Sequence, residues 1–244
     1  MSPLLNWISD DKLFNAINKL NNSITDGIAK SNTEFDDNVT DPFSALTSMM
    51  FFNLSQGKWK DYEKYRRKQK SLSNAIGLFH QHILGSITGW KDLGTNKGID
   101  IVNRDKQIIA EIKNKHNTVK GSDLVHLYNK LKNTIESQDS AYNGYTAYYV
   151  TIIPESPNEN PHPFTPSDSN THQRVPENPN IIQIDGKQFY SLATGEDSAL
   201  VDLFDILYKI FSYNKYNYHL HLKPENKPYI CTIFRCAFGI DHRF

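Results

Sequence analysis

The chain has 244 residues, and its 27 basic and 27 acidic side chains give a formal net charge of zero at pH 7. A neutral chain is not a generic nucleic-acid coat, because such proteins bind through an excess of positive charge. No apolar run approaches the roughly 18 residues that a membrane-spanning helix needs. The first twenty residues lack the basic and apolar regions of a secretory signal, so we expect no membrane partner and a cytoplasmic location.

The first seventy residues carry helical signals. Apolar residues at helical spacing predict an amphipathic helix over residues 11–31. Pro42 indicates the start of a second helix with a broad apolar face, and the polar residues 56–70 indicate a helix or an ordered loop. Residues 58–70 carry a net charge of +5. Such a run is either a solvated helix face or a surface aimed at phosphates, and both interpretations stay open.

A helix followed by a hairpin comes next. Residues 71–87 form one apolar stripe at helical spacing, and Ser71 or Ser73 is the expected N-cap. Residues 98–102 and 107–113 are typical of two strands joined by a tight turn. This α-β-β order places a two-stranded hairpin directly after an amphipathic helix.

The second half alternates helices and strands. We expect a helix over residues 122–137 and a strand over 145–153, which is rich in aromatic and β-branched residues. Residues 154–180 contain many Pro, Asn and Ser and predict a long loop. Residues 181–184 form a short strand before a glycine turn, and residues 198–211 form a helix.

This order of elements predicts an α/β fold in which helices cover a mixed central sheet. We expect one domain over residues 1–244, with a helical N-terminal extension in residues 1–70. A catalytic core would follow in residues 71–153. Residues 154–244 would complete the core and contribute contacts to DNA.

The hairpin carries the pattern D-x10-E-x-K at Asp100, Glu111 and Lys113. Alternation along a strand places Glu111 and Lys113 on the same face, and antiparallel pairing would bring Asp100 close to Glu111. Two close carboxylates repel each other unless a cation lies between them. Together with the backbone carbonyl of Ile112, they would suit Mg²⁺. Lys113 would stabilise charge on a phosphate or position a water, so the pattern indicates metal-assisted hydrolysis of phosphodiesters.

The pattern alone is weak, because E-x-K also occurs on solvent-facing strands. Here the strand is otherwise apolar, and a polar and basic string follows it at once. Amides, hydroxyls and lysines at that place suit DNA phosphates and base edges. The candidate DNA-binding residues in this string are Asn114, Lys115, His116, Asn117, Thr118 and Lys120.

The hairpin between helices resembles the PD-(D/E)xK nuclease core. The longer strings NAIGLFHQHILGSITGW and GIDIVNRDKQIIAEIKNKHNTVKGSD resemble the type II restriction endonucleases that recognise GGNCC, over residues 71–131. The resemblance implies a restriction-endonuclease-like fold and Mg²⁺-dependent cleavage of both strands of double-stranded DNA, after the first G. It also implies a homodimer and a partner DNA methyltransferase that modifies cytosine.

The chain departs from the family pattern at two places. The expected proline is absent, since the sequence before the first acid is Gly98-Ile99-Asp100. The helix over residues 71–87 also lacks the acid that many such nucleases carry there. Gln81, which we include in the catalytic set, or His80 would complete the water shell of the metal. The alternative is that His80 is satisfied by its neighbours and that Gln81 has no such role.

Further arginines and lysines are candidates for DNA contact. Arg66 and Arg67 would clamp backbone phosphate, and Arg174 lies in the long loop. A target that begins with GG calls for a bidentate Arg or Lys on guanine, for which Arg174, Lys187 and Lys120 are the candidates.

Two other functions are compatible with these residues. One is another PD-(D/E)xK nuclease of the repair or junction type, and the other is a non-catalytic DNA-binding protein of the same fold. The presence of Asp100, Glu111 and Lys113 together favours an enzyme.

Overall fold

A computed structural model describes residues 3–33, 39–94, 98–157, 160–168, 171–212 and 223–240. The chain forms two compact units: residues 14–79 make one, and residues 1–13 together with 80–244 make the other. Within the described ranges, no helix has both the length and the apolar character needed to cross a membrane.

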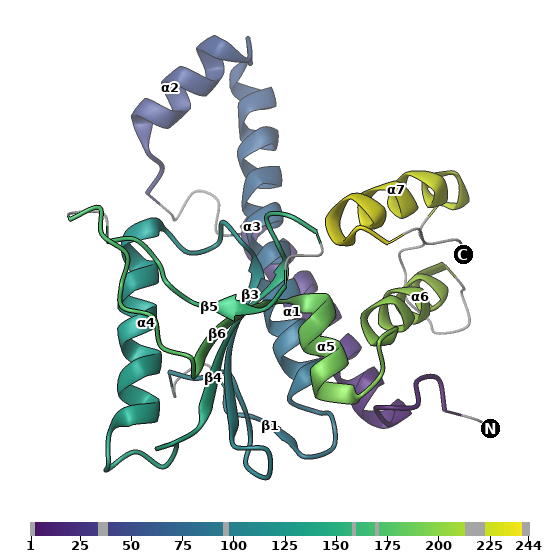
Figure 1. The fold of residues 1–244 in the computed structure, drawn as a ribbon. Coiled ribbons are helices and arrows are strands. Elements are labelled where there is room, and N and C mark those ends of the chain that lie inside the picture. The colour runs from purple at the N-terminus through teal and green to yellow at the C-terminus, as the bar shows by residue number, and fades with distance from the viewer. Residues whose placement is uncertain are drawn as a thin grey trace. The chain divides into compact units, whose positions relative to one another are not determined.

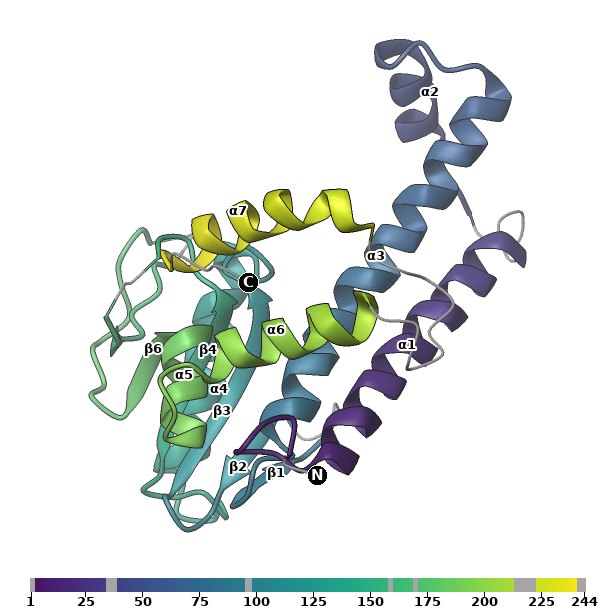
Figure 2. The same cartoon turned by 90° about the vertical axis from the view of Figure 1, so that its right-hand side faces the viewer.

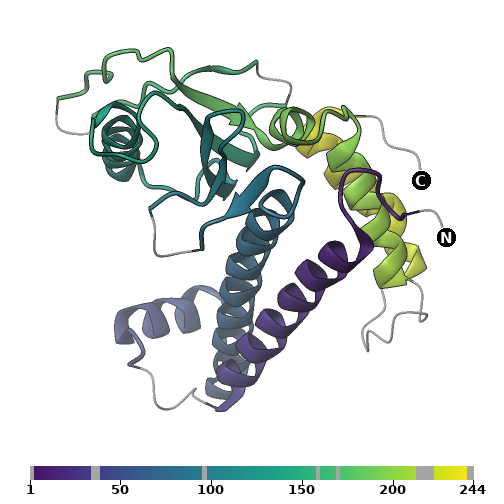
Figure 3. The ribbon, with the colours of Figure 1, turned by 90° about the horizontal axis from the view of Figure 1, so that it is seen from below.

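The unit of residues 14–79 is helical. It contains most of α1 (Asp10–Thr33), α2 (Pro42–Phe51) and most of α3 (Gln56–Leu84). Within it α1 and α3 run side by side (Figures 2 and 3), and Gly27 lies so close to Ser71 that a Cβ at position 27 would be 2.5 Å from the Cβ of Ser71. The expected helix over residues 11–31 is therefore present.

The predicted segment 56–70 and the predicted helix 71–87 up to Leu84 form the single helix α3, so the expected N-cap at Ser71 or Ser73 is wrong. Neither glycine nor proline occurs between residues 58 and 76, so nothing interrupts the helix. The Ser73 hydroxyl donates to the carbonyl of Gln69 at 3.0 Å, which is the bond of a serine inside a helix.

The helix α2 starts where the sequence indicates. The Asp41 carboxylate caps it by accepting a hydrogen bond of 2.9 Å from the Phe43 amide, and Pro42 occupies the first turn. The Trp59 indole donates to the Ser48 hydroxyl at 2.9 Å, which ties α2 to α3. No residue of α2 is buried, so the broad apolar face of this helix is open to solvent.

The other unit is built on a mixed six-stranded sheet (Figure 1). The strand order is β1-β2-β3-β4-β6-β5, with β3, β4 and β6 parallel and the remaining pairs antiparallel. The strands are β1 (Trp90–Asp92), β2 (Ile101–Asn103), β3 (Ile108–Lys115), β4 (Thr146–Ile153), β5 (His162–Pro163) and β6 (Ile181–Asp185). The predicted mixed central sheet is confirmed.

Helices cover both faces of the sheet (Figure 3). On one face α4 (Gly121–Glu136) packs Leu127 and Leu131 against the sheet in a cluster with Ile109. On the other face α5 (Gly186–Thr194) places Phe189 against Tyr148, with ring centroids 5.7 Å apart. The fold is therefore the expected α/β fold with a restriction-endonuclease-like arrangement of sheet and helices.

Two more helices complete this unit. They are α6 (Ala199–Ser212) and α7 (Lys227–Phe238), which lie next to each other in Figure 2. The rings of Phe204 and Phe234 pack with centroids 4.4 Å apart. The helix α6 was predicted, whereas α7 was not.

The expected glycine turn after β6 is wrong, because Gly186 opens α5. The Asp185 carboxylate caps this helix by accepting a hydrogen bond of 2.7 Å from the Gln188 amide. A Cβ at Gly186 would be 2.5 Å from the carbonyl oxygen of Ile152, so the close approach of helix and strand requires glycine.

The region predicted as a long loop, residues 154–180, contains regular structure. It includes β5 and a bridge that pairs Ser167 with Arg174. Phe164, directly after β5, is only 2% exposed and belongs to the core under α4. A strand of two residues shows no periodicity in sequence, which is why the pattern missed it.

Candidate active site

The hairpin places the carboxylates of Asp100 and Glu111 opposite each other. Ile101 pairs with Ala110 in the antiparallel register, and the Asp100 amide donates to the Ala110 carbonyl at 3.1 Å. The next opposed pair is therefore Asp100 and Glu111. The Asp100 Oδ2 atom also accepts a hydrogen bond of 2.7 Å from the Ile112 amide, so the Ile112 backbone lies against this carboxylate.

Glu111 is buried and is paired with two lysines. The Lys113 Nζ atom lies 2.7 Å from Glu111 Oε1, and the Lys130 Nζ atom lies 3.0 Å from Glu111 Oε2. Lys113 comes from the same strand and was predicted, whereas Lys130 comes from α4 and was not. Each carboxylate oxygen of Glu111 thus accepts a charge-assisted hydrogen bond.

Gly98 makes room for Lys130. It has a φ of +76°, a left-handed conformation that favours glycine, and a Cβ there would lie 3.1 Å from the Cε of Lys130. The next residue, Ile99, is 2% exposed and belongs to the core. The family's missing proline is thus replaced by a glycine bend and a buried isoleucine that lead into Asp100.

Burial and the neighbouring charge of Glu111 raise the pKa of Asp100 to about 6, against its ordinary value of 3.8. The Ile112 amide, Lys113 and Lys130 act in the opposite direction. The two facing carboxylates repel each other when both are ionised. A divalent cation bound between them would remove this repulsion, so the pair is suited to bind one. The described residues contain no cluster of three or more His, Cys, Asp or Glu side chains, so main-chain and water oxygens would complete such a site.

A row of polar side chains continues from Glu111 across the same face of the sheet. Glu111 pairs with Tyr149 on β4, Tyr149 with Gln183 on β6, and Gln183 with His162 on β5. Beside this row, Lys113 pairs with Thr151. Paired residues on adjacent strands point to the same face, so the acidic pair and these groups share one surface.

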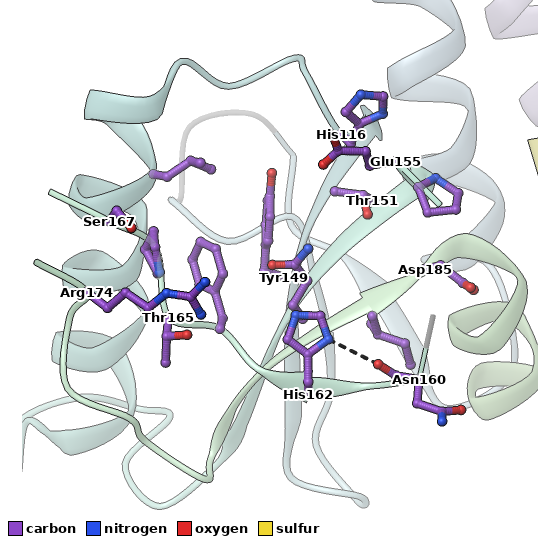
Figure 4. Close-up of a pocket in the computed structure, with 16 residues that line it drawn as sticks. His116, Tyr149, Thr151, Glu155, Asn160, His162, Thr165, Ser167, Arg174 and Asp185 are labelled. Atoms are coloured by element: carbon purple, nitrogen blue, oxygen red, sulfur yellow. Dashed lines mark hydrogen bonds between the residues drawn. The ribbon is translucent and has the colours of Figure 1, made fainter. Parts of the chain in front are cut away.

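A pocket of about 470 Å³ opens on this surface (Figure 4), and Tyr149, the strand neighbour of Glu111, is part of its lining. Tyr149 stands in the middle of it, with His162 of β5 and Arg174 reaching in beside it. Burial raises the pKa of Tyr149 to about 12, and the charge of Glu111 adds to this rise. The Tyr149 hydroxyl therefore stays protonated and can donate a hydrogen bond.

Comparison with known proteins gives the chain its family. The model of the family described as Eco47II restriction endonuclease matches residues 5–213. The chain belongs to the Eco47II restriction endonuclease family. It is 41% identical over 204 residues to the type II restriction enzyme Eco47II of Escherichia coli, covering 84% of this chain and 85% of the relative. It is 30% identical over 203 residues to the type II restriction enzyme Sau96I of Staphylococcus aureus, covering 82% and 76%.

Membership in this family makes the protein a site-specific endonuclease that acts on double-stranded DNA. The alternatives of a repair or junction nuclease and of a non-catalytic DNA-binding protein are therefore dropped. The region matched by the family model contains both strands of the hairpin, α4 and the pocket.

The polar string, residues 114–120, begins with the last two residues of β3 and continues to His116, which lines the pocket. Lys115 ends the strand, and the His116 amide donates to the Ile153 carbonyl at 3.0 Å. The Thr118 hydroxyl accepts a hydrogen bond of 3.2 Å from the Lys115 amide and closes the turn. The members of the string with exposed side chains are Lys115, Asn117, Thr118 and Lys120. Asn114 and His116 are half-buried.

Gln81 contacts β1, the edge strand of the sheet, and not the strand that carries Glu111. Its Nε2 atom donates to Asp92 Oδ1 at 2.8 Å, and Asp92 is on β1, two strands away from β3. His80 shares a hydrogen bond of 2.9 Å with the Tyr190 hydroxyl, and burial lowers its pKa to about 4. His80 thus has the satisfied environment of a packed histidine.

Arg66 and Arg67 belong to the helical unit. Both hold the buried carboxylate of Glu63, at 2.7 Å for Arg66 Nε and 3.0 Å for Arg67 Nε. The hydrogen bond from Arg66, together with that from Arg67, lowers the pKa of Glu63 against the opposing effect of burial. The Arg66 side chain is still 57% exposed, so it can reach a ligand.

Proposed function

We propose that the chain is a type II restriction endonuclease that cleaves both strands of double-stranded DNA at GGNCC, after the first G, with Mg²⁺. The observation that carries the reaction is the opposed pair of Asp100 and Glu111, with Lys113 on the same face, in a member of this family. The target sequence rests on the resemblance of residues 71–131 to the GGNCC-recognising endonucleases.

Asp100 and Glu111 would hold the metal together with the carbonyl of Ile112. The bound ion would neutralise phosphate charge and lower the pKa of a water ligand. Lys113 would exchange its hydrogen bond to Glu111 for one to a phosphate oxygen or to the attacking water. Its ammonium group already lies at the site, because it is hydrogen-bonded to Glu111. We include Gln81 in the catalytic set as an outer ligand to the water shell.

The DNA would lie along the end of β3 and the start of α4. The exposed ammonium groups of Lys115 and Lys120 would contact phosphates, which position the duplex without reading its sequence. The remaining proposed contacts are Asn114, His116, Asn117, Thr118, Arg66, Arg67 and Arg174.

We further propose a homodimer and a partner DNA methyltransferase. A palindromic target presents the same scissile bond twice, and each chain holds one pair formed by Asp100 and Glu111. Two chains related by a two-fold axis would therefore cut both strands. The whole chain would act as one nuclease domain, with methylation protecting the host's own sites.

The test uses two plasmids of similar size, one with several GGNCC sites and one in which every site has been removed. Incubation with Mg²⁺ should give discrete bands from the first plasmid only, and EDTA should abolish them. Sequencing of the fragment ends should place the cut after the first G. Cleavage of the site-free plasmid into bands would overturn the target sequence, and a smear from both plasmids would overturn site specificity.

A further inference from the structure

The polar surface that starts at the acidic pair ends in a pocket that the cleavage chemistry does not use. We propose that this pocket binds the base edge of a guanine close to the scissile phosphate, with Arg174 as its reader, so that the pocket sets the target sequence. This inference rests on the proposed function, because it assumes that Asp100 and Glu111 mark the position of the scissile phosphate.

Buried polar atoms without partners point to a ligand. The Tyr149 hydroxyl and the His116 Nδ1 atom both line the pocket, and neither has a hydrogen-bond partner among the described residues. Tyr149 is only 2% exposed. Buried polar groups in native proteins are almost always hydrogen-bonded, so these two atoms are fitted to a molecule that brings its own donors and acceptors.

The charges of the lining favour a base over a phosphate. Arg174 is accompanied by two carboxylates, Glu155 and Asp185, and by amide, hydroxyl and imidazole groups such as those of Gln183 and His162. A phosphate would be repelled by the carboxylates. A base edge presents donors and acceptors side by side, and the O6 and N7 atoms of guanine accept a bidentate pair from arginine. The volume of about 470 Å³ accommodates such a ring.

Arg174 is presented by an anchored segment. Its backbone pairs with Ser167, and the Val175 amide donates to the Pro166 carbonyl at 3.0 Å. Phe164 is buried in the core at one end, and at the other end the Tyr128 hydroxyl donates to the Pro176 carbonyl at 2.6 Å. Figure 4 shows the guanidinium reaching toward the middle of the pocket from this segment.

The pocket lies at the right distance from the cleavage site. Glu111, Tyr149 and Gln183 are neighbours on three adjacent strands, so about 10 Å separates the first from the last at the usual strand spacing. This span equals about three base-pair steps along a duplex. A base read there belongs to the same short target as the scissile bond.

The experiment selects DNA from a randomised duplex library by binding in Ca²⁺ and, separately, by cleavage in Mg²⁺, followed by sequencing. Arg174→Ala should relax the choice at one G·C pair, with a loss of discrimination of about 10- to 100-fold at that position. The matched control is Arg104→Ala, because Arg104 stacks on Tyr142 outside the pocket, with 5.6 Å between its Cζ atom and the ring centroid. The control should keep the full consensus.

Tyr149→Phe is a second variant, since it removes only a hydroxyl that has no protein partner in the described structure. It should keep or raise the melting temperature and lower the affinity for the selected sequence about tenfold, with binding to random DNA unchanged.

The outcomes separate the two levels of the proposal. An unchanged consensus in Arg174→Ala would overturn the pocket as the reading site. A wild-type consensus other than GGNCC would overturn the assigned target. The test of the pocket would then be whether Arg174→Ala relaxes one G·C position of the consensus that is found. Selective binding without cleavage in Mg²⁺ would overturn the nuclease assignment, while relaxation by Arg174→Ala in Ca²⁺ would still support the pocket.

Discussion

Glu111 on β3 and Lys130 on α4 form an ion pair across the site, with Oε2 and Nζ 3.0 Å apart. The pair links β3, which carries Glu111, to α4, which packs over this face of the sheet. Because Lys113 holds the other oxygen of Glu111, the site contains two ammonium groups for two carboxylates. The two ammonium groups offset the charge of the buried Glu111 and of the half-buried Asp100.

Lys130→Met should shift the acid limb of the cleavage profile to higher pH. The charge of Lys130 helps to lower the pKa of Asp100, so its removal raises that pKa above about 6 and reduces the ionised fraction near neutrality. Cleavage rates at limiting Mg²⁺ should fall several-fold at pH 6.5 and less at pH 8.5. Lys132→Met is the matched control on the same helix, since Lys132 pairs with Glu136. Parallel profiles for Lys130→Met and wild type would refute this coupling.

Asp100→Asn should stabilise the metal-free protein at alkaline pH. The pKa of Asp100 is raised from 3.8 to about 6 in the folded state, so the wild type loses stability as the pH rises through this interval. Near pH 4 the residue is protonated in the folded state and only about half ionised in the unfolded state, so the variant gains little. At pH 8 the gain should be about 1–3 kcal/mol. Urea unfolding in EDTA at pH 4 and pH 8 measures it, and equal stabilities at pH 8 would contradict it.

Lys113→Ala should separate binding from cleavage. It removes an ammonium group at the acidic pair and leaves the exposed string after β3 unchanged. We expect cleavage to fall by at least a hundredfold, while the affinity for the target in Ca²⁺ changes by less than about threefold. Lys91→Ala, on the exposed edge of β1, controls for the loss of one positive charge. Normal cleavage by Lys113→Ala would remove it from the catalytic set.

Gln81→Leu and Asp92→Ala remove the two halves of one hydrogen bond. Both should lower the free energy of unfolding, by about 1 kcal/mol for the amide and more for the carboxylate, which also accepts from His82 and from the Gly94 amide. If Gln81 serves the water shell of the metal as proposed, Gln81→Leu should lose much more cleavage than Asp92→Ala at equal folded fraction. Equal losses would leave Gln81 a purely structural residue.

The part of the site that follows from local rules could be predicted. Strand alternation places Glu111 and Lys113 on one face, and a short turn places Asp100 opposite Glu111. Lys130 could not be predicted in this way, because its position depends on how α4 crosses the sheet. In the sequence it resembles its neighbour Lys132, and only the buried Leu127 and Leu131 on either side show that it borders the packed face.

The errors in the fold have similar causes. Ser71 and Ser73 have hydroxyls suited to an N-cap, but a serine inside a helix can also donate its hydroxyl to a carbonyl of the preceding turn. Ser73 does this to Gln69. Gly186 has the character of a turn residue, yet here it allows α5 to approach the backbone of Ile152. In each case the sequence permits two local structures; a bond within the helix decides at Ser73, and packing against β4 decides at Gly186.

The anchoring of the segment that carries Arg174 makes the pocket modular. Its two attachments are Phe164, which is buried in the core and also borders the pocket, and the bond from Tyr128 to Pro176. Residues 165–168 and 171–174 lie between these attachments, so we expect that they can change without disturbing β3 or the pair formed by Asp100 and Glu111. Exchange of this short stretch between relatives is a direct route to restriction enzymes with new target sequences on an unaltered cleavage centre.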